Sequence, residues 1–237
     1  MARTDPTPPS GRSASSSASA KSALADFAAA TRPLTARQLR AWLAERGYPA
    51  FRAQQVLQWT YRRGAQSFAV MSDVPAVLRG ELAEAFRFPA LTPEVVARSA
   101  DDTRKLLFRL DAGTAIESVI IPDLPRLTLC ISSQAGCGMG CGFCATARLG
   151  LIRNLRADEI VGQVLAARRE LAFDERLTNI VFMGMGEPLA NYEAIVEAIE
   201  MLIADWGVGL SSRRITVSTV GLVPAMTRLV GETQVNL

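Results

Sequence analysis

The chain has 237 residues, of which 49% are hydrophobic and 21% are charged, and its formal net charge is +3. This length is enough for one or two domains with a buried core. The sequence contains no run of 18 apolar residues, the length needed to cross a membrane. The start of the chain lacks the apolar segment of a signal peptide. These features argue against an integral membrane protein and against a secreted one.

Arginine supplies 24 of the 26 positively charged residues, and lysine only 2. Guanidinium groups pair with phosphates and stack on bases, so the bias is compatible with RNA binding. The general composition of an arginine- and alanine-rich proteome would explain the bias equally well.

Residues 1–33 are rich in Ser, Ala, Pro and Thr. We expect a disordered tail there, because large apolar side chains are too few to offset the entropy of ordering. A helical domain is predicted over residues 34–90, with a first helix that Thr35 caps and further helices from about residues 50 and 75. The predicted helical domain contains eight arginines but only four acidic residues. This excess of positive charge indicates either an RNA-binding surface or the solvated face of a small helical bundle.

The rest of the chain reads first as strands and then as alternating helices and strands. Residues 91–126 are expected to form a β-rich linker, and residues 127–237 an α/β core. In the core the pattern predicts helices over 156–171, 192–203 and 224–230, and strands over 127–132, 177–183, 214–219 and from 235. Such alternation predicts a parallel sheet covered by helices.

The most informative motif is Cys137-Gly-Met-Gly-Cys141-Gly-Phe-Cys144. It places three soft thiolates in one short loop, and the chain contains no histidine to complete a mixed site. Three thiolates favour an iron–sulfur cluster with one iron left without a protein ligand. A structural zinc site, which usually takes two pairs of ligands, and buried or disulfide-bonded cysteines are the alternatives. Because all four cysteines lie between residues 130 and 144, we expect a reducing, cytoplasmic setting.

The segment from Cys130 to Thr146, followed by Gly150 and by Arg153-Asn154-Leu155, resembles the RlmN family of radical S-adenosylmethionine RNA methyltransferases. The resemblance runs from about residue 35 to the end of the chain. It implies a partial radical-SAM (β/α)6 barrel, a [4Fe–4S] cluster on Cys137, Cys141 and Cys144, and S-adenosylmethionine as cofactor. It also implies methylation of C2 of an adenosine in 23S rRNA and in tRNAs, while the related Cfr enzymes methylate C8.

The resemblance assigns S-adenosylmethionine to residues that follow two predicted strands. Gly186 and Glu187 match the family's Gly-Glu segment, which binds the amino group, and Ser218 matches a serine that contacts the cofactor. Active sites of parallel α/β barrels lie at this end of the strands. A plain turn at Gly186 and Glu187, and a capping or loop role for Ser218, are the structural alternatives.

Two further residues receive catalytic roles from the resemblance. Glu117, a carboxylate within an apolar strand, matches the family's proposed proton acceptor, and partial burial would raise its pKa toward the useful range. Cys130 matches the cysteine that helps to resolve a covalent enzyme–RNA intermediate, and a disulfide bond is among the implied features. Taken alone, Glu117 would face solvent and Cys130 would be a small buried residue.

The family's second catalytic cysteine and its Ser-Leu-His segment have no counterpart in the 237 residues. In the family that cysteine accepts a methyl group, which a radical from a second S-adenosylmethionine then activates. We therefore expect a C-terminally truncated form that does not complete methyl transfer, and a non-catalytic RNA-binding or iron–sulfur protein is the runner-up. A flavodoxin-like reductant and a monomeric state complete the expectations.

Overall fold

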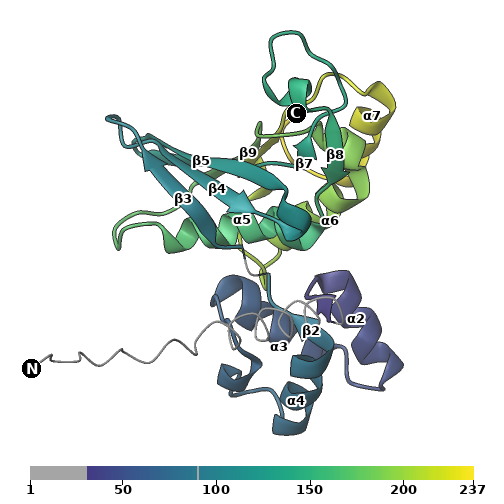
Figure 1. The fold of residues 1–237 in the computed structure, drawn as a ribbon. Helices are drawn as coiled ribbons and strands as arrows, with labels where there is room; N and C mark the ends of the chain where they lie inside the picture. Colours follow the sequence, from purple (N-terminus) through teal and green to yellow (C-terminus); the bar gives the residue numbers. More distant parts are fainter. Residues whose placement is uncertain (1–30, 90) are drawn as a thin grey trace, which may run out of the picture.

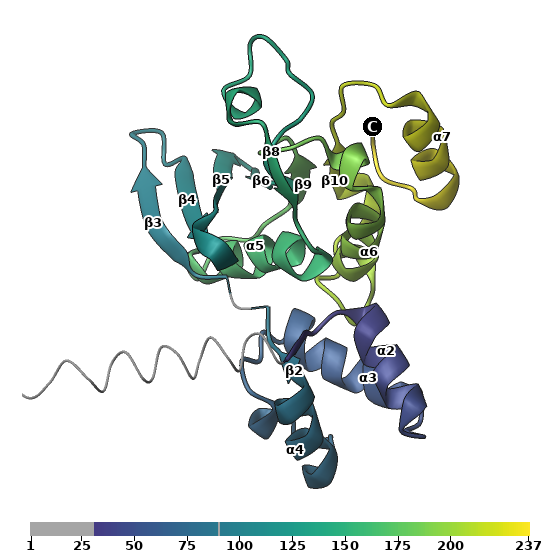
Figure 2. The same cartoon turned by 45° about the vertical axis from the view of Figure 1, so that its right-hand side comes forward.

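The computed structural model describes residues 31–89 and 91–237, so that most of the predicted tail lies outside the described part. A helical unit from the first third of the chain lies beneath an open sheet and its covering helices (Figure 1). The loop that carries the three clustered cysteines projects from the end of the sheet that is remote from the helical unit (Figures 1 and 2).

The helical unit contains α2 (Ala36–Glu45), α3 (Phe51–Leu57) and α4 (Ala76–Ala85), and α3 continues into a π-helical turn, Gln58–Arg62. The predicted cap is present, because the backbone N–H of Gln38 donates to Oγ1 of Thr35 at 3.4 Å. Apolar side chains at helical spacing, among them Leu39 and Leu43, form the core of the unit.

The helix predicted from about residue 75 would carry Phe86 on its apolar face, but α4 ends at Ala85 and Phe86 lies on a short strand. Strand β2 (Phe86–Arg87) pairs in parallel with β1 (Arg32–Pro33), which joins the two ends of the helical unit. The side chain of Phe86 is buried against the Trp42 ring at 5.5 Å between centroids, so packing and strand pairing override the helical pattern here.

One six-stranded sheet, in the order β10-β9-β6-β5-β4-β3, forms the centre of the molecule. Its strands are β3 (Pro93–Arg98), β4 (Arg104–Arg109), β5 (Ala115–Asp123), β6 (Arg126–Cys130), β9 (Asn179–Phe182) and β10 (Ile215–Val217). The segment predicted as a linker is thus the antiparallel half of the same sheet. Strands β6, β9 and β10 pair in parallel, as the helix–strand alternation predicts, and within the described residues the sheet stays open.

Helices α5 (Ala157–Arg169) and α6 (Tyr192–Ile203) cover one face of this sheet, and α7 (Val223–Glu232) follows β10 (Figure 2). On β5 the residues that point to the helices, Ile116, Ser118 and Ile120, are fully buried, while the intervening residues are half-buried. The half-buried residues face the opposite side, which would be the interior if the sheet curled into a barrel.

Two local features differ from the predicted pattern. A small antiparallel pair, β7 (Gln134–Gly136) with β8 (Leu151–Asn154), brackets the cysteine loop and was not predicted. The strand expected from residue 235 is reduced to a single parallel bridge between Thr216 and Asn236. Among the described residues, no helix is both long and apolar enough to cross a membrane.

Candidate active site

The cysteine loop is closed at its base by two glycines. The backbone N–H of Cys137 donates to the carbonyl of Gly150 at 2.9 Å, and Gly136 has a φ of +73°. A Cβ at Gly136 would lie 1.9 Å from the carbonyl oxygen of Gly150, so no other residue fits there. This close approach holds together the two ends of residues 137–150.

The three clustered cysteines are free thiols in this one loop. Cys137 is buried, while Cys141 and Cys144 are half-buried. Hydrogen bonds from the backbone of Ala147 and Thr146 lower the pKa of the Cys144 thiol. Within the described residues, no three cysteine or acidic side chains converge closely enough to hold a metal ion. The structure therefore gathers the thiols in one place without arranging their sulfur atoms around a common centre.

A buried polar network supports the segment that leads into this loop. The side-chain carbonyl of Gln163, on α5, accepts hydrogen bonds from Ser118 Oγ at 2.7 Å and from the Ser132 backbone N–H at 2.8 Å. Ser132 Oγ donates to the Glu117 carbonyl at 2.6 Å and accepts from the Met185 N–H at 2.9 Å. These contacts join β5, the end of β6, α5 and the loop after β9.

The loop after β9 lies directly against the residues that follow β6. The carbonyl of Met185 accepts the N–H groups of Ser133 and Gln134 at 2.8 and 3.1 Å. Gly186 has a φ of +102°, and a Cβ there would lie 2.5 Å from the Cβ of Gln134. Gly186 therefore permits a close contact between two chain segments, which is a more specific role than that of a plain turn.

The carboxylate of Glu187 is buried, with 2% of the residue exposed, and is bonded within the protein. Its Oε1 accepts the N–H of Leu189 at 2.9 Å and the hydroxyl of Thr219 at 2.7 Å. Its Oε2 accepts the N–H of Val220 at 2.8 Å. A carboxylate offers about four acceptor positions, so these three bonds leave one position on Oε2 unfilled within the described structure.

Ser218 lies at the carboxyl end of β10, is exposed, and makes no side-chain hydrogen bond within the described part of the chain. Its neighbour Thr219 instead makes the bond to Glu187. The structure thus brings Gly186, Glu187 and the segment after β10 together at the carboxyl ends of the parallel strands, which is the edge that also carries the cysteine loop.

Glu117 and Cys130 lie on the sheet face opposite the helices. In the sheet register Lys105 is opposite Val119, and Val119 is opposite Cys130, so the side chains of Lys105, Val119 and Cys130 form one row across the sheet. Glu117 lies two residues before Val119 on β5, in the next row. Glu117 is 41% exposed at its side chain and pairs with the Lys105 ammonium at 3.0 Å. Glu117 is therefore a half-buried carboxylate that is paired with a lysine.

Cys130 is half-buried, and burial raises the pKa of its thiol, while a hydrogen bond from the backbone of Met183 acts in the opposite direction. All four cysteines of the chain are free, so the structure contains no disulfide among them. Glu117 and Cys130 share one face of the sheet and come from the neighbouring antiparallel strands β5 and β6.

Sequence reasoning missed the polar residues that shape this edge: Lys105, Ser132, Ser133, Gln134, Gln163, Asn191 and Thr219. Asn191, for example, donates to the carbonyls of Ser133 and Leu155 at 2.9 and 2.7 Å and so ties two turns together. Only the run of polar residues between the apolar strand and Cys137 could have signalled this role, because buried polar side chains need partners.

The donor set fits an iron–sulfur cluster chemically. Three thiols occupy eight residues, and the backbone already directs N–H groups at one sulfur. A tetrahedral structural zinc site would need a fourth ligand besides these three thiolates.

Two family models match the chain. One is described as the ribosomal RNA large subunit methyltransferase N-terminal domain and matches residues 32–87. The other is described as the radical SAM superfamily and matches residues 131–235. The first coincides with the helical unit, and the second begins just before the cysteine loop.

Curated relatives are similar over most of the chain. A protein of Geobacter sulfurreducens, named dual-specificity RNA methyltransferase RlmN, is 50% identical over 204 residues, which is 86% of this chain and 56% of the relative. One of the same name from Anaeromyxobacter dehalogenans is 48% identical over 87% of this chain and 57% of its own. The chain therefore spans about half the length of the curated relatives that it matches.

A solved structure shares the fold. The crystal structure of a radical SAM methyltransferase from Sphaerobacter thermophilus superposes with a TM-score of 0.76 and 45% sequence identity. The match covers 85% of this chain and 60% of that one.

Proposed function

The chain belongs with the RlmN-type radical SAM methyltransferases, and from this premise we propose that it supplies the RNA-binding and cofactor-binding parts of an enzyme that methylates C2 of an adenosine in 23S rRNA and in tRNAs. The observation that supports this most is structural. One edge of the parallel strands carries the three-cysteine loop together with the Gly186-Glu187 turn and the segment after β10.

In the proposed site Cys137, Cys141 and Cys144 hold a [4Fe–4S] cluster. Gly186, Glu187 and Ser218 bind S-adenosylmethionine next to it. When bound, the cluster supplies the electron that cleaves S-adenosylmethionine reductively. Glu187 has one free acceptor position for the ligand ammonium, and Ser218 is exposed at the strand end, so both can reach a ligand at this edge.

Glu117 and Cys130 are proposed as the catalytic pair on the open face of the sheet. Glu117 would accept the proton of the reacting adenine carbon, and Cys130 would act on the covalent RNA intermediate. Lys105, at 3.0 Å, orients the Glu117 carboxylate on this face. Both side chains are half-buried, so an adenine stacked on the sheet could reach them.

The partners follow from the same premise. The proposed enzyme works in the cytoplasm as a monomer, acts on 23S rRNA and tRNA, and receives electrons from a flavodoxin-like reductant. Methylation of C8 is the second candidate, because the three-cysteine loop and Cys130 do not separate the two positions. A non-catalytic RNA-binding or iron–sulfur protein is the third.

Anaerobic reconstitution with iron and sulfide should load about four irons per chain, visible in the Mössbauer spectrum of a [4Fe–4S] cluster. Replacing Cys137, Cys141 or Cys144 with alanine should abolish this uptake, because each removes a thiolate ligand. Cys130→Ala is the matched control and should retain full iron content. Stoichiometric zinc without iron uptake in the unaltered chain would contradict the proposal.

The reaction is tested with the reconstituted chain, S-adenosylmethionine, a reductant, and unmodified 23S rRNA or tRNA. We expect 5′-deoxyadenosine from cofactor cleavage, and mass spectrometry of the digested RNA locates any methyl group. 2-Methyladenosine supports the C2 assignment, and 8-methyladenosine supports the C8 alternative. A cluster-loaded chain that binds RNA but cleaves no cofactor favours the non-catalytic reading.

A further inference from the structure

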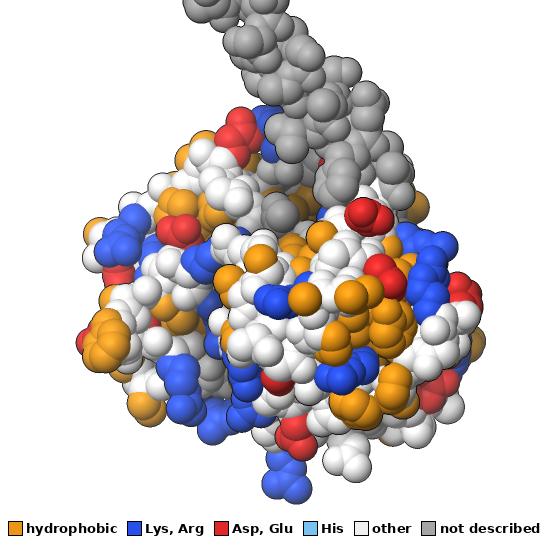
Figure 3. Space-filling view, turned by 90° about the horizontal axis from the view of Figure 1, so that it is seen from below, with side chains coloured by type: hydrophobic (Ala, Val, Ile, Leu, Met, Phe, Trp, Pro, Cys, Tyr) orange, Lys and Arg blue, Asp and Glu red, His pale blue; other side chains and the backbone are white. Residues whose placement is uncertain are grey.

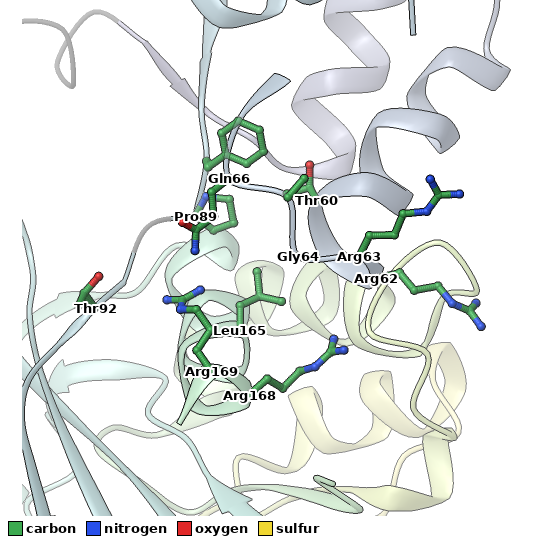
Figure 4. Close-up of a pocket in the computed structure, with 12 residues that line it drawn as sticks. Thr60, Arg62, Arg63, Gly64, Gln66, Pro89, Thr92, Leu165, Arg168 and Arg169 are labelled. Atoms are coloured by element: carbon green, nitrogen blue, oxygen red, sulfur yellow. The ribbon is translucent and has the colours of Figure 1, made fainter. Parts of the chain in front are cut away.

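A cavity of about 470 Å³ lies between the helical unit and α5, at the end of the molecule away from the cysteine loop (Figure 4). Its wall comes from the π-helical turn and the loop that follows, from Phe88, Pro89 and Thr92, and from the last turns of α5. Figure 4 shows Arg168 and Arg169 rising from α5 on either side of Leu165. The predicted active site makes no use of this region.

The charge of this cavity is uniformly positive. Four arginines line it and no acidic residue does: Arg62, Arg63, Arg168 and Arg169. Within the described structure none of the four forms a salt bridge. They contact neutral groups, since Arg168 donates to the Tyr61 carbonyl at 3.3 Å and Arg63 lies 4.3 Å above the Trp59 ring. Such contacts orient a guanidinium without neutralising it, and most of its five donors remain free.

A second cavity of about 600 Å³ extends the positive surface. The two cavities share Arg168, and the second adds Arg176 and Arg214 near the amino-terminal ends of β9 and β10. Its one acidic residue, Glu175, is already engaged in a two-pronged pair with Arg104. We call the combined surface the arginine groove and define it by Arg62, Arg63, Arg168, Arg169, Arg176 and Arg214.

Several arginines elsewhere on the surface are paired with acids. Arg40 bonds Glu200 at 2.8 Å, and Arg228 bonds both Glu193 and Glu232. Viewed from below, the helical unit is in front, and Lys and Arg side chains follow the seam between it and the body behind (Figure 3). Arg52, Arg79, Arg148 and Arg213 also lack a salt bridge within the described structure, but they line neither cavity. What distinguishes the groove is that six arginines without a salt bridge line two neighbouring cavities.

Surrounding protein atoms bury part of the Arg168 guanidinium, and this desolvation lowers the pKa of Arg168. A partly desolvated cation without a counter-charge is unfavourable, and a bound anion would offset that cost. Guanidinium forks match the oxygens of phosphate in pairs. Successive arginines along two neighbouring cavities suit a chain of phosphates better than one small anion.

We propose that the arginine groove binds the phosphodiester backbone of the RNA substrate, away from the adenosine that reacts. This inference rests on the proposed function for its choice of RNA as the polyanion. The groove lies at the opposite edge of the sheet from the cysteine loop, so it contributes affinity and orientation without touching the reacting base.

The test compares two triple variants with equal loss of charge. R63Q/R169Q/R176Q removes three groove arginines and spares the partly buried Arg168. R98Q/R109Q/R126Q removes three exposed arginines that pair with Asp102, Glu94 and Asp123 on the sheet edge and its turns. Affinity for an unmodified RNA hairpin is measured by fluorescence anisotropy at several KCl concentrations.

We expect the groove variant to reduce the salt slope of log Kobs by about 2–3, roughly one per lost phosphate contact, and to weaken binding at least tenfold in moderate salt. The control variant should keep slope and affinity near those of the unaltered chain. Equal losses in both variants, or an unchanged groove variant, would overturn the proposal.

A second measurement needs no variant. RNA should protect groove arginines of the unaltered chain from phenylglyoxal, as read by peptide mass spectrometry, while Arg98 and Arg126 stay reactive. Protection confined to arginines outside the groove would also overturn the proposal. Binding of S-adenosylmethionine by the reconstituted groove variant should be unchanged. A chain that binds RNA through the groove yet takes up neither cluster nor cofactor would disprove the proposed function and leave the groove intact.

Discussion

Replacing Glu187 with alanine is expected to lower the free energy of unfolding by about 3–5 kcal/mol, because hydrogen bonds to a buried carboxylate contribute about 1.5–3 kcal/mol each. The substitution leaves the N–H groups of Leu189 and Val220 and the hydroxyl of Thr219 without their acceptor. Since these donors lie after β9 and β10, the two strand ends lose their common anchor.

The same substitution should weaken binding of S-adenosylmethionine by about 1.5–3 kcal/mol, the range for a charge-assisted hydrogen bond. Urea unfolding of the chain measures the first effect, and calorimetric titration of the reconstituted protein measures the second. An unchanged affinity in a folded Glu187→Ala protein would remove this carboxylate from the cofactor site.

Glu187→Gln separates the two effects. The amide oxygen can still accept from Leu189 and Thr219, but the amide nitrogen would face the N–H of Val220, which is also a donor. We expect a smaller loss of stability, about 1–3 kcal/mol for the one lost bond, with most of the loss of cofactor affinity retained. Thr219→Val is the matched control at the neighbouring strand, because it removes one donor and leaves the charge.

Arg104→Met should lower the free energy of unfolding by about 2–4 kcal/mol, because it breaks a two-pronged pair at a buried guanidinium. Arg104 is 2% exposed on β4, and it bonds both carboxylate oxygens of Glu175 and the carbonyl of Glu170. These bonds fasten the segment after α5 to the sheet.

Arg109→Met is the matched control on the same strand. Arg109 also forms a two-pronged pair, with Glu94 at 2.7 and 3.2 Å, but both side chains are about half exposed. Exposed pairs contribute about 0–1 kcal/mol, so urea unfolding should show little change. Equal losses in the two variants would mean that burial does not set the strength of the Arg104 pair.

The Arg104 pair should also make stability depend on pH. The hydrogen bond from Arg104 lowers the pKa of Glu175 below its ordinary value of 4.5. A carboxyl group whose pKa is lower in the folded state stabilises the fold above its unfolded pKa, and this contribution is lost as the pH falls through the folded value. The difference in unfolding free energy between the unaltered chain and Arg104→Met should therefore shrink as the pH is lowered below about 4.5.

The sequence by itself determined the parts that depend on local pattern. Thr35 and the apolar residues at helical spacing predicted α2, and helix–strand alternation predicted the parallel arrangement of β6, β9 and β10. The spacing of Cys137, Cys141 and Cys144 indicated the chemistry of the loop. The inferences on α2 and on the parallel strands are confirmed, because capping and periodicity act over a few residues. The role of the three cysteines as cluster ligands stays a prediction.

Only the tertiary structure decided which segments meet. The residues predicted as a linker join the main sheet through strand pairing, and the Glu187 carboxylate meets Thr219 and Val220, more than thirty residues away. The arginine groove likewise combines residues near 62, 168 and 214, none of which stands out locally. Such contacts depend on how strands and helices pack across long separations, and a single sequence carries no local signal for that packing.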